Sequence, residues 1–264
     1  MKSTVVGNYP KISSDKSAPN LRNALNAFDG KKISPADLEQ VYQSTIRRVM
    51  AEQEQADLDI ITDGQIRWDD LVTPLAKNIS GFEIGGLIRF FNNNVYYRRP
   101  VVKSALKFKH SATVEQFKFA QSVSSKPVKV SLPGPFTFAA LSLDEYYKNQ
   151  EKLVMDLAEI LHQEILELEK EGCKHIQLDE PFLSGQPERF ELAQSGIQTV
   201  LKGIKAHKTL FFYFGRVDKF LPKLSLDSVD AVGIDLVSHK ENLDALLKFE
   251  AGKKEVVLGC LDAR

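Results

Sequence analysis

The stretch that decides the fold runs Lys174-His175-Ile176-Gln177-Leu178-Asp179-Glu180-Pro181. It is typical of a buried strand that leads into two adjacent carboxylates and stops at a proline, because proline cannot donate to a sheet ladder. Charge at the edge of a core is costly unless something binds it. A helix N-cap or a turn explains the same residues, so the rest of the chain has to decide between a site and a cap.

Apolar strand-like runs recur along the chain and alternate with amphipathic helical segments. The further strands are predicted at 3–10, 59–64, 128–132, 209–215, 231–237 and 255–261, and the main helices at 35–56, 65–77, 113–122, 150–171 and 191–206. This alternation indicates a parallel sheet covered by helices. The repeat count favours a single α/β domain over residues 1–264, a (β/α)8 TIM barrel. No GxGxxG or P-loop pattern follows the first strand, which argues against a nucleotide-binding sheet.

Two segments depart from the repeat, and one strand of a barrel is not found. Residues 11–33 are polar and read as irregular, and residues 81–109 predict a hairpin excursion because glycine, asparagine and alternating residues replace the strand–helix pattern. Only seven strands are found, whereas a closed barrel needs an eighth to remove its open edges. We therefore expect the last strand and helix to be missing from this chain, beyond Arg264.

Length and composition limit the class of protein. The 264 residues suit one α/β barrel, which typically has about 250. Formal net charge is zero, from 35 basic and 35 acidic residues, which gives no electrostatic reason to expect a nucleic-acid or anionic-membrane partner. Two cysteines provide no disulfide framework, and no apolar run approaches the roughly 18 residues of a membrane span. The sequence predicts a globular cytoplasmic protein.

Polar residues recur where the predicted strands end. In an α/β barrel the loops at the carboxyl ends of the strands build the active site. The residues at these ends are Gly7, Asn8, Asp63, Gln65, Thr137, Asp179, Glu180, Tyr213, Asp235 and Asp262. Each has a separate explanation as a cap or turn residue. Their recurrence at the same end of successive strands predicts a polar pocket for a cationic or hydrogen-bond-donating group, such as an amine.

Several other side chains have two interpretations. Arg67, Arg89, Arg98 and Arg99 could hold a carboxylate or a glutamate tail, or form surface salt bridges. Trp68 is either the floor of the pocket or core, and Tyr96-Tyr97 is a candidate aromatic lid for a flat ring.

Metal and nucleophile motifs are absent from the sequence. The five histidines show no His-x-Cys or HExxH spacing, and no GxSxG elbow occurs. Cys173 precedes a strand and is interpreted as structural, and Cys260 as a core residue of the seventh strand. The sequence predicts no metal site.

Five segments together resemble the cobalamin-independent methionine synthase family. They recur in order over nearly the whole chain and are Val5 to Pro10, Thr62 to Gln65 with Arg67 and Asp69, Leu132 to Thr137, Ile176 to Pro181, and Leu258 to Arg264. The resemblance implies a (β/α)8 barrel that transfers a methyl group from a methylated folate, or in some short members from a methylated corrinoid. The acceptor it implies is homocysteine, held as a thiolate on zinc, which lowers the thiol pKa.

The zinc ligands of the family are not matched. Its catalytic barrel carries His-x-Cys at the end of the fifth strand, where this chain has Phe211 and Tyr213. A zinc-binding Glu one strand later corresponds to Asp235, and a further Cys would lie past Arg264. Zinc is thus the metal that the resemblance implies but not one that these residues suit.

The amino-acid site is matched in part. The family's carboxylate-binding Ser corresponds to Asn8 and its amine-binding Glu to Gln65, whereas Asp179 is unchanged. Other features, including the segments Phe91–Tyr97 and Tyr213–Gly215, look more like the non-zinc N-terminal barrel of the long enzymes. The chain is therefore interpreted as a stand-alone member of that N-terminal type.

Three hypotheses follow. The first is a methyltransferase of methionine biosynthesis in which Asp179 holds the substrate amine and the loop from Pro133 to Thr137 shapes the pocket. The second is a non-catalytic binding or assembly subunit that partners a zinc-bearing barrel. The third is a methyltransferase linked to a corrinoid protein or a thiol, with another acceptor.

Overall fold

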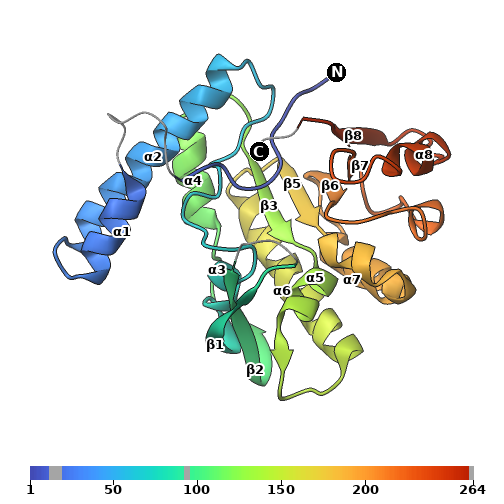
Figure 1. The fold of residues 1–264 in the computed structure, drawn as a ribbon, viewed down its shortest axis with the longest axis horizontal. Coiled ribbons are helices and arrows are strands. Elements are labelled where there is room, and N and C mark those ends of the chain that lie inside the picture. Colours follow the sequence, from blue (N-terminus) through green and yellow to red (C-terminus); the bar gives the residue numbers. More distant parts are fainter. Residues whose placement is uncertain (12–19, 92–95, 262–264) are drawn as a thin grey trace. The chain divides into compact units, whose positions relative to one another are not determined.

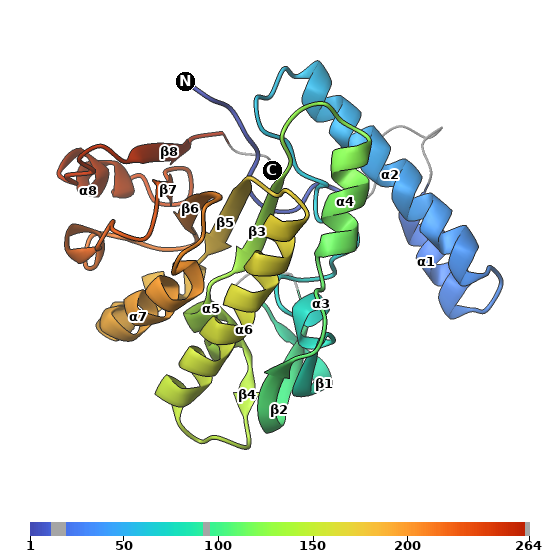
Figure 2. The same ribbon diagram turned by 180° about the vertical axis from the view of Figure 1, so that it is seen from behind.

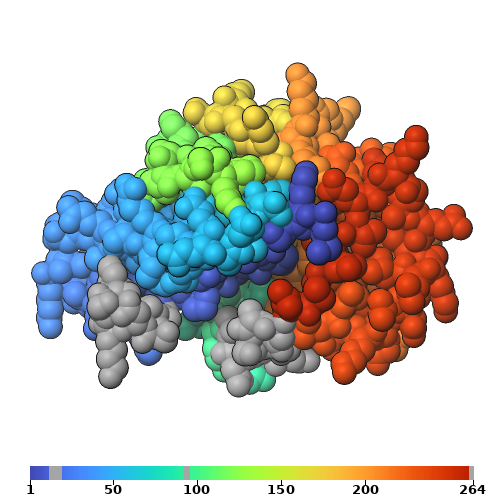
Figure 3. Space-filling view, turned by 90° about the horizontal axis from the view of Figure 1, so that it is seen from above, coloured from blue at the N-terminus to red at the C-terminus, as the bar shows by residue number. Residues whose placement is uncertain are grey.

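The structure is a computed structural model that describes residues 1–11, 20–91 and 96–261. The chain forms two compact units, described separately below. Unit 1 comprises Met1–Asp69 and Glu115–Lys129, and unit 2 comprises Asp70–Val114 and Val130–Arg264. Figures 1 and 2 show the ribbon from opposite sides, and Figure 3 shows one face of the surface.

Unit 1 is mainly helical. Helix α2 (Pro35–Gln55) begins where predicted, because Ser34 and Asp37 form a capping box in which each side chain accepts from the other's backbone N–H, at 3.2 and 2.8 Å. Its apolar stripe of Leu38, Ile46, Val49 and Met50 is buried. Helix α4 (Val114–Ser122) also confirms its prediction.

Two local predictions in this part of the chain were wrong. Helix α1 (Leu21–Asp29), capped by Asn20, occupies part of the segment expected to be irregular. The prediction missed it because the asparagines of this segment made the helical spacing of Leu21, Leu25 and Phe28 less evident. The helix expected over 65–77 is reduced to α3 (Thr73–Ala76), which belongs to unit 2.

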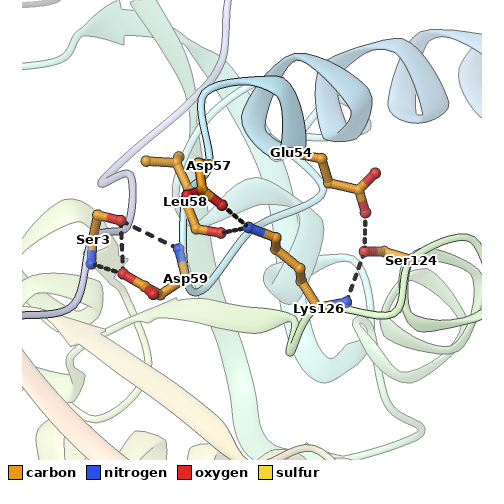
Figure 4. Close-up of polar contacts among 7 residues, drawn as sticks. All are labelled: Ser3, Glu54, Asp57, Leu58, Asp59, Ser124 and Lys126. Carbon is orange, nitrogen blue, oxygen red and sulfur yellow. Dashed lines mark hydrogen bonds and ion pairs between the residues drawn. The ribbon is translucent and has the colours of Figure 1, made fainter.

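The first two predicted strands of unit 1 are reduced to short parallel bridges. Thr4 pairs with Ile60, and Ile61 pairs with Val128. Both ends of this region are held by side-chain contacts (Figure 4): the Ser3 N–H and hydroxyl donate to Asp59 Oδ2 at 2.7 and 2.9 Å. Lys126 Nζ donates to the Leu58 carbonyl at 2.6 Å. These contacts fix the pairing although the strands are short.

Unit 2 contains the predicted hairpin. Strands β1 (Ile79–Arg89) and β2 (Tyr96–Phe108) pair antiparallel with two register shifts, and β4 (Leu143–Asp144) adds to β2 in parallel. At Gly81, φ is +100° and a Cβ would lie 2.8 Å from the carbonyl oxygens of Ser104 and Ala105. Only glycine fits this close approach of the two strands.

The centre of unit 2 is a parallel sheet in the order β3-β5-β6-β7-β8. The strands are β3 (Lys129–Pro133), β5 (His175–Asp179), β6 (His207–Phe212), β7 (Ala231–Asp235) and β8 (Glu255–Gly259). All five were predicted, with ends that differ by a few residues. The sheet is parallel throughout and is followed by helices, as expected for an α/β barrel.

Helices follow the strands of this sheet, as expected for parallel connections. They are α5 (Pro135–Leu141), α6 (Gln150–Lys170), α7 (Phe190–Leu201) and α8 (Asn242–Leu247). Helices α5, α6 and α7 pack against one another beside the sheet (Figures 1 and 2). Helices α5 and α8 were not predicted, because each is only one to two turns long.

The two faces of the sheet differ in character. Successive residues of a strand point to opposite faces, so Ile176 and Leu178 share one face of β5 while Gln177 and Asp179 share the other. Phe211 of β6 lies on the second face over Gly233 of β7, where a Cβ would fall 2.0 Å from its ring. The polar residues of β5 thus lie on the same face as an aromatic ring.

Strand β8 lies at the end of the sheet order, and its outer residues are exposed. Val256 is 38% and Leu258 50% exposed, and the dark red segment that contains β8 lies at the surface in Figure 3. Cys260 follows β8 and is exposed, so the prediction that it is core was wrong. Cys173, interpreted as structural, is buried. None of the helices in the described ranges is long and apolar enough to cross a membrane.

Candidate active site

The buried carboxylate of Glu180 holds the start of helix α5. Its Oε1 accepts the Phe136 N–H at 2.9 Å, and its Oε2 accepts the Thr137 N–H at 2.9 Å and the Thr137 hydroxyl at 2.6 Å. These backbone N–H groups have no partner within the helix, and a carboxylate satisfies them. The loop after β3 and the end of β5 are therefore joined through Glu180 and Thr137.

Gly134 makes this contact possible. A Cβ at position 134 would lie 2.1 Å from Glu180 Oε1, so any side chain there would displace the carboxylate. The Gly134 N–H also donates to the Asp179 carbonyl at 2.7 Å. The Pro-Gly-Pro sequence therefore combines a strand end, a close approach and a helix start.

Substituting Gly134→Ala is expected to destabilise the fold by about 2 to 4 kcal/mol, because the methyl group overlaps a fully buried side chain. The measurement is the free energy of unfolding in urea. Gly185→Ala is the matched control, since a Cβ at 185 meets no atom within 4 Å. Equal stability of the two variants would contradict the packing described.

Burial raises the pKa of Glu180 from 4.5 to about 7. The three hydrogen bonds from Thr137 and Phe136 act against this shift, and the neighbouring Asp179 adds to it. The carboxyl group of Glu180 therefore changes its charge near neutral pH.

Asp179 lies beside Glu180 and is 1% exposed. Gln177 Nε2 donates to Asp179 Oδ1 at 2.7 Å. The Tyr213 side chain also hydrogen-bonds to Asp179, and burial, followed by the Asp179 and Glu180 charges, raises the pKa of Tyr213 well above 10. Tyr213 is therefore a neutral phenol at physiological pH. Two neutral donors from β5 and from the end of β6 thus orient the Asp179 carboxylate.

Asp235 has a local role in the structure. Its Oδ1 accepts the N–H groups of Val237 and Ser238 at 2.9 and 3.1 Å, which forms a turn after β7. The amide of Asn242, which was not predicted, joins this turn to the β6 loop: its Nδ2 donates to the carbonyls of Asp235 at 3.0 Å and Gly215 at 3.1 Å. Asn242 is 1% exposed, and no sequence pattern marked it.

Four of the remaining predicted site residues belong to unit 1. Asp63 Oδ1 accepts the Gln65 N–H at 2.9 Å in a tight turn, where Gln65 has a left-handed φ of 49° and is 7% exposed. Gly7 has a φ of +79°, and Asn8 is exposed. The turn explains why Asp63 is needed, and the pocket role of these four residues stays a prediction. Asp262 lies outside the described residues.

The residues with two interpretations are largely structural. Arg67 forms a two-pronged ion pair with Glu39, at 2.5 and 2.6 Å, and lies over the Tyr42 ring. Trp68 is 3% exposed and its Nε1 donates to Gln116 at 2.8 Å. Tyr97 is buried and its hydroxyl donates to the Leu141 carbonyl at 2.8 Å, so it packs in the core rather than forming a lid.

The residues at the family's zinc positions do not fit a zinc ion. Phe211 has no donor atom and packs over Gly233, Tyr213 is a neutral phenol, and Asp235 caps a turn. In the ranges 1–11, 20–91 and 96–261, no group of three or more histidine, cysteine or acidic residues could hold a metal. These three residues therefore supply no zinc ligand set for the reaction.

Comparisons with known proteins give a consistent result. The family model "Cobalamin-independent synthase, Catalytic domain" matches residues 1–264. A methionine synthase from Sulfurisphaera tokodaii is 31% identical over 263 residues, which is 99% of this chain and 75% of that protein. A methionine synthase from Saccharolobus solfataricus is also 31% identical, over 99% of this chain and 77% of that protein.

A solved structure confirms the fold. The B12-independent methionine synthase from Shewanella sp. W3-18-1, in complex with selenomethionine, superposes with a TM-score of 0.78 at 22% identity over 97% of this chain and 79% of that one. The match of sequence and family model over the whole chain establishes its membership. The chain belongs to the cobalamin-independent methionine synthase family and is a methyltransferase.

Proposed function

We propose that this protein transfers a methyl group to the sulfur of homocysteine in methionine biosynthesis, and that Asp179 holds the substrate ammonium. The observation that carries the proposal is the buried Asp179 carboxylate, oriented by Gln177 and Tyr213 at the end of β5. These two donors fix the direction of the carboxylate, and a carboxylate binds an ammonium group through charge-assisted hydrogen bonds.

Glu180 has a supporting part in this proposal. Its two oxygens already accept three hydrogen bonds from Phe136 and Thr137, so it fixes the loop after β3 instead of binding substrate. On the basis of the family resemblance, Gly7, Asn8, Asp63 and Gln65 of unit 1 are assigned to substrate binding. Thr137, Tyr213 and Asp235 of unit 2 are assigned to substrate binding as well, with Asp235 acting through its turn.

The methyl donor is proposed to be a methylated folate or a methylated corrinoid. Methyl transfer needs a thiolate, and the residues of this chain at the family's zinc positions do not provide the ligands that would form it. This observation favours a second candidate, a binding or assembly subunit that partners a zinc-bearing barrel or a corrinoid protein. A cytoplasmic location is proposed as well, since Cys173 and Cys260 form no disulfide.

The test combines an assay and a metal measurement. The purified protein is supplied with homocysteine and either methylated folate or methylated corrinoid, and methionine is quantified; bound zinc is measured on the same sample. Methionine formation by the protein alone supports the first candidate. The second candidate is supported if the protein alone forms no methionine but increases the amount of methionine that an added zinc-bearing barrel of the family forms by itself. No stimulation and no activity would contradict both.

A further inference from the structure

We propose that a cluster of aromatic side chains, joined to Asp179 through Tyr213, binds a methylated cation, a sulfonium or a quaternary ammonium group. Phe91, Phe182, Phe214 and Tyr213 form the aromatic part, and the Asp179 carboxylate supplies the opposite charge. This inference goes beyond the proposed function, because it names a ligand class that the site would take whether or not homocysteine is the acceptor.

Covalent and hydrogen bonds link the Asp179 carboxylate to two of the aromatic residues. Glu180 follows Asp179, and Glu180 Oε2 accepts from the Thr137 hydroxyl at 2.6 Å. The Phe182 N–H donates to the same Thr137 oxygen at 3.1 Å. On the other side, Tyr213 hydrogen-bonds to Asp179. Tyr213 thus contacts Asp179 directly, whereas the Phe182 backbone is linked to it through Thr137 and Glu180.

The four aromatic side chains form a continuous series of contacts from Phe182 to Tyr213. The Phe182 and Phe91 ring centroids lie 5.1 Å apart, those of Phe91 and Phe214 5.2 Å, and those of Phe214 and Tyr213 4.7 Å with the planes at 86°. Phe91 comes from the end of the hairpin, Phe182 from the segment after β5, and Phe214 from the segment after β6. Three separate segments of unit 2 thus bring rings to one place.

The backbone is strained at two of these residues. Phe91 has a φ of 52° and Phe214 a φ of 64°, a left-handed conformation that is unfavourable for a bulky residue. Phe214 is also 43% exposed, so packing alone does not account for its position. Strained residues of this kind concentrate at ligand clamps.

The chemistry selects a methylated cation. The faces of aromatic rings attract cations, and quaternary ammonium groups are recognised by such rings. A methylated cation sheds its water more readily than a primary ammonium and has no N–H donors to satisfy. An anion would be repelled by Asp179, and a neutral ligand would not use its charge. Charge, aromatic rings and partial exposure together favour the methylated cation.

The experiment compares choline with its neutral carbon analogue, 3,3-dimethylbutan-1-ol, by calorimetric titration of the full chain. Choline is expected to bind at least about tenfold more tightly than the analogue. Trimethylsulfonium and tetramethylammonium titrations distinguish the two kinds of cation. Equal affinity for choline and the neutral analogue would overturn the proposal.

Variants locate the site. Phe214→Leu is expected to weaken choline binding about tenfold, and Phe214→Tyr to retain it. Tyr146→Leu is the control, because Tyr146 is an exposed aromatic residue (51% exposed) that does not belong to this cluster of four. An equal loss in the Tyr146 variant, or none in Phe214→Leu, would overturn the assignment. Methionine formation is assayed separately, so the choline titration can be interpreted even if the protein forms no methionine.

Discussion

Substituting Asp179→Asn is expected to lower kcat/KM for homocysteine on the order of 100-fold. The physical reason is the loss of a buried ion pair between the carboxylate and the substrate ammonium, which costs about 2 to 5 kcal/mol when one partner is removed. Asparagine has nearly the same shape, and its amide oxygen can still accept the bond from Gln177 Nε2. The effect should therefore appear in activity more than in folding.

The matched control for this variant is Asp244→Asn, which removes an exposed carboxylate of helix α8. Both variants are compared by steady-state kinetics and by thermal unfolding. A change below about threefold for Asp179→Asn, with the protein folded, would remove Asp179 from the substrate site. A similar loss in the control would point to a general effect of charge.

The second large effect is a pH dependence of stability caused by Glu180. Its pKa is 4.5 in an ordinary environment and about 7 in the fold, so the folded protein holds the proton more tightly than the unfolded chain. The contribution to stability is complete below about pH 4.5 and is lost as pH rises to about 7. The shift corresponds to about 3 kcal/mol of unfolding free energy lost across this window.

Substituting Glu180→Gln should remove this slope. Glutamine also weakens the contacts to Phe136 and Thr137, which lowers stability by a similar amount at every pH. The measurement is the free energy of unfolding in urea between pH 4 and 8, and the result of interest is the difference in slope. Glu83→Gln serves as the exposed control. Parallel curves for wild type and Glu180→Gln would show that Glu180 is not the titrating group.

The sequence predicted the parallel sheet well because its strands carry a strong local pattern. The run from His175 to Asp179 is continuous, and β5 ends at Asp179, two residues before Pro181. Helix α2 was equally well marked by Ser34 and Pro35. The short helices α5 and α8 were not predicted, because a helix of one to two turns has too few residues to show a hydrophobic periodicity.

The site was predicted in part, for a similar reason. Asp179 and Glu180 stand at a strand end and could be found, but their different roles depend on burial and on partners from Gly134 to Thr137 that no local pattern reveals. Gln177 could have been found, since alternation places it on the same face as Asp179. Phe91 and Phe214 could not, because they meet only through the tertiary fold.

The most direct test of the account is a binding comparison on the wild-type protein between homocysteine and 4-mercaptobutanoic acid, which lacks only the amino group. If Asp179 holds the substrate ammonium, homocysteine binds at least about 30-fold more tightly, as expected for a buried charge pair, and Asp179→Asn abolishes the difference. Equal binding of the two thiols to the wild-type protein would contradict the assignment.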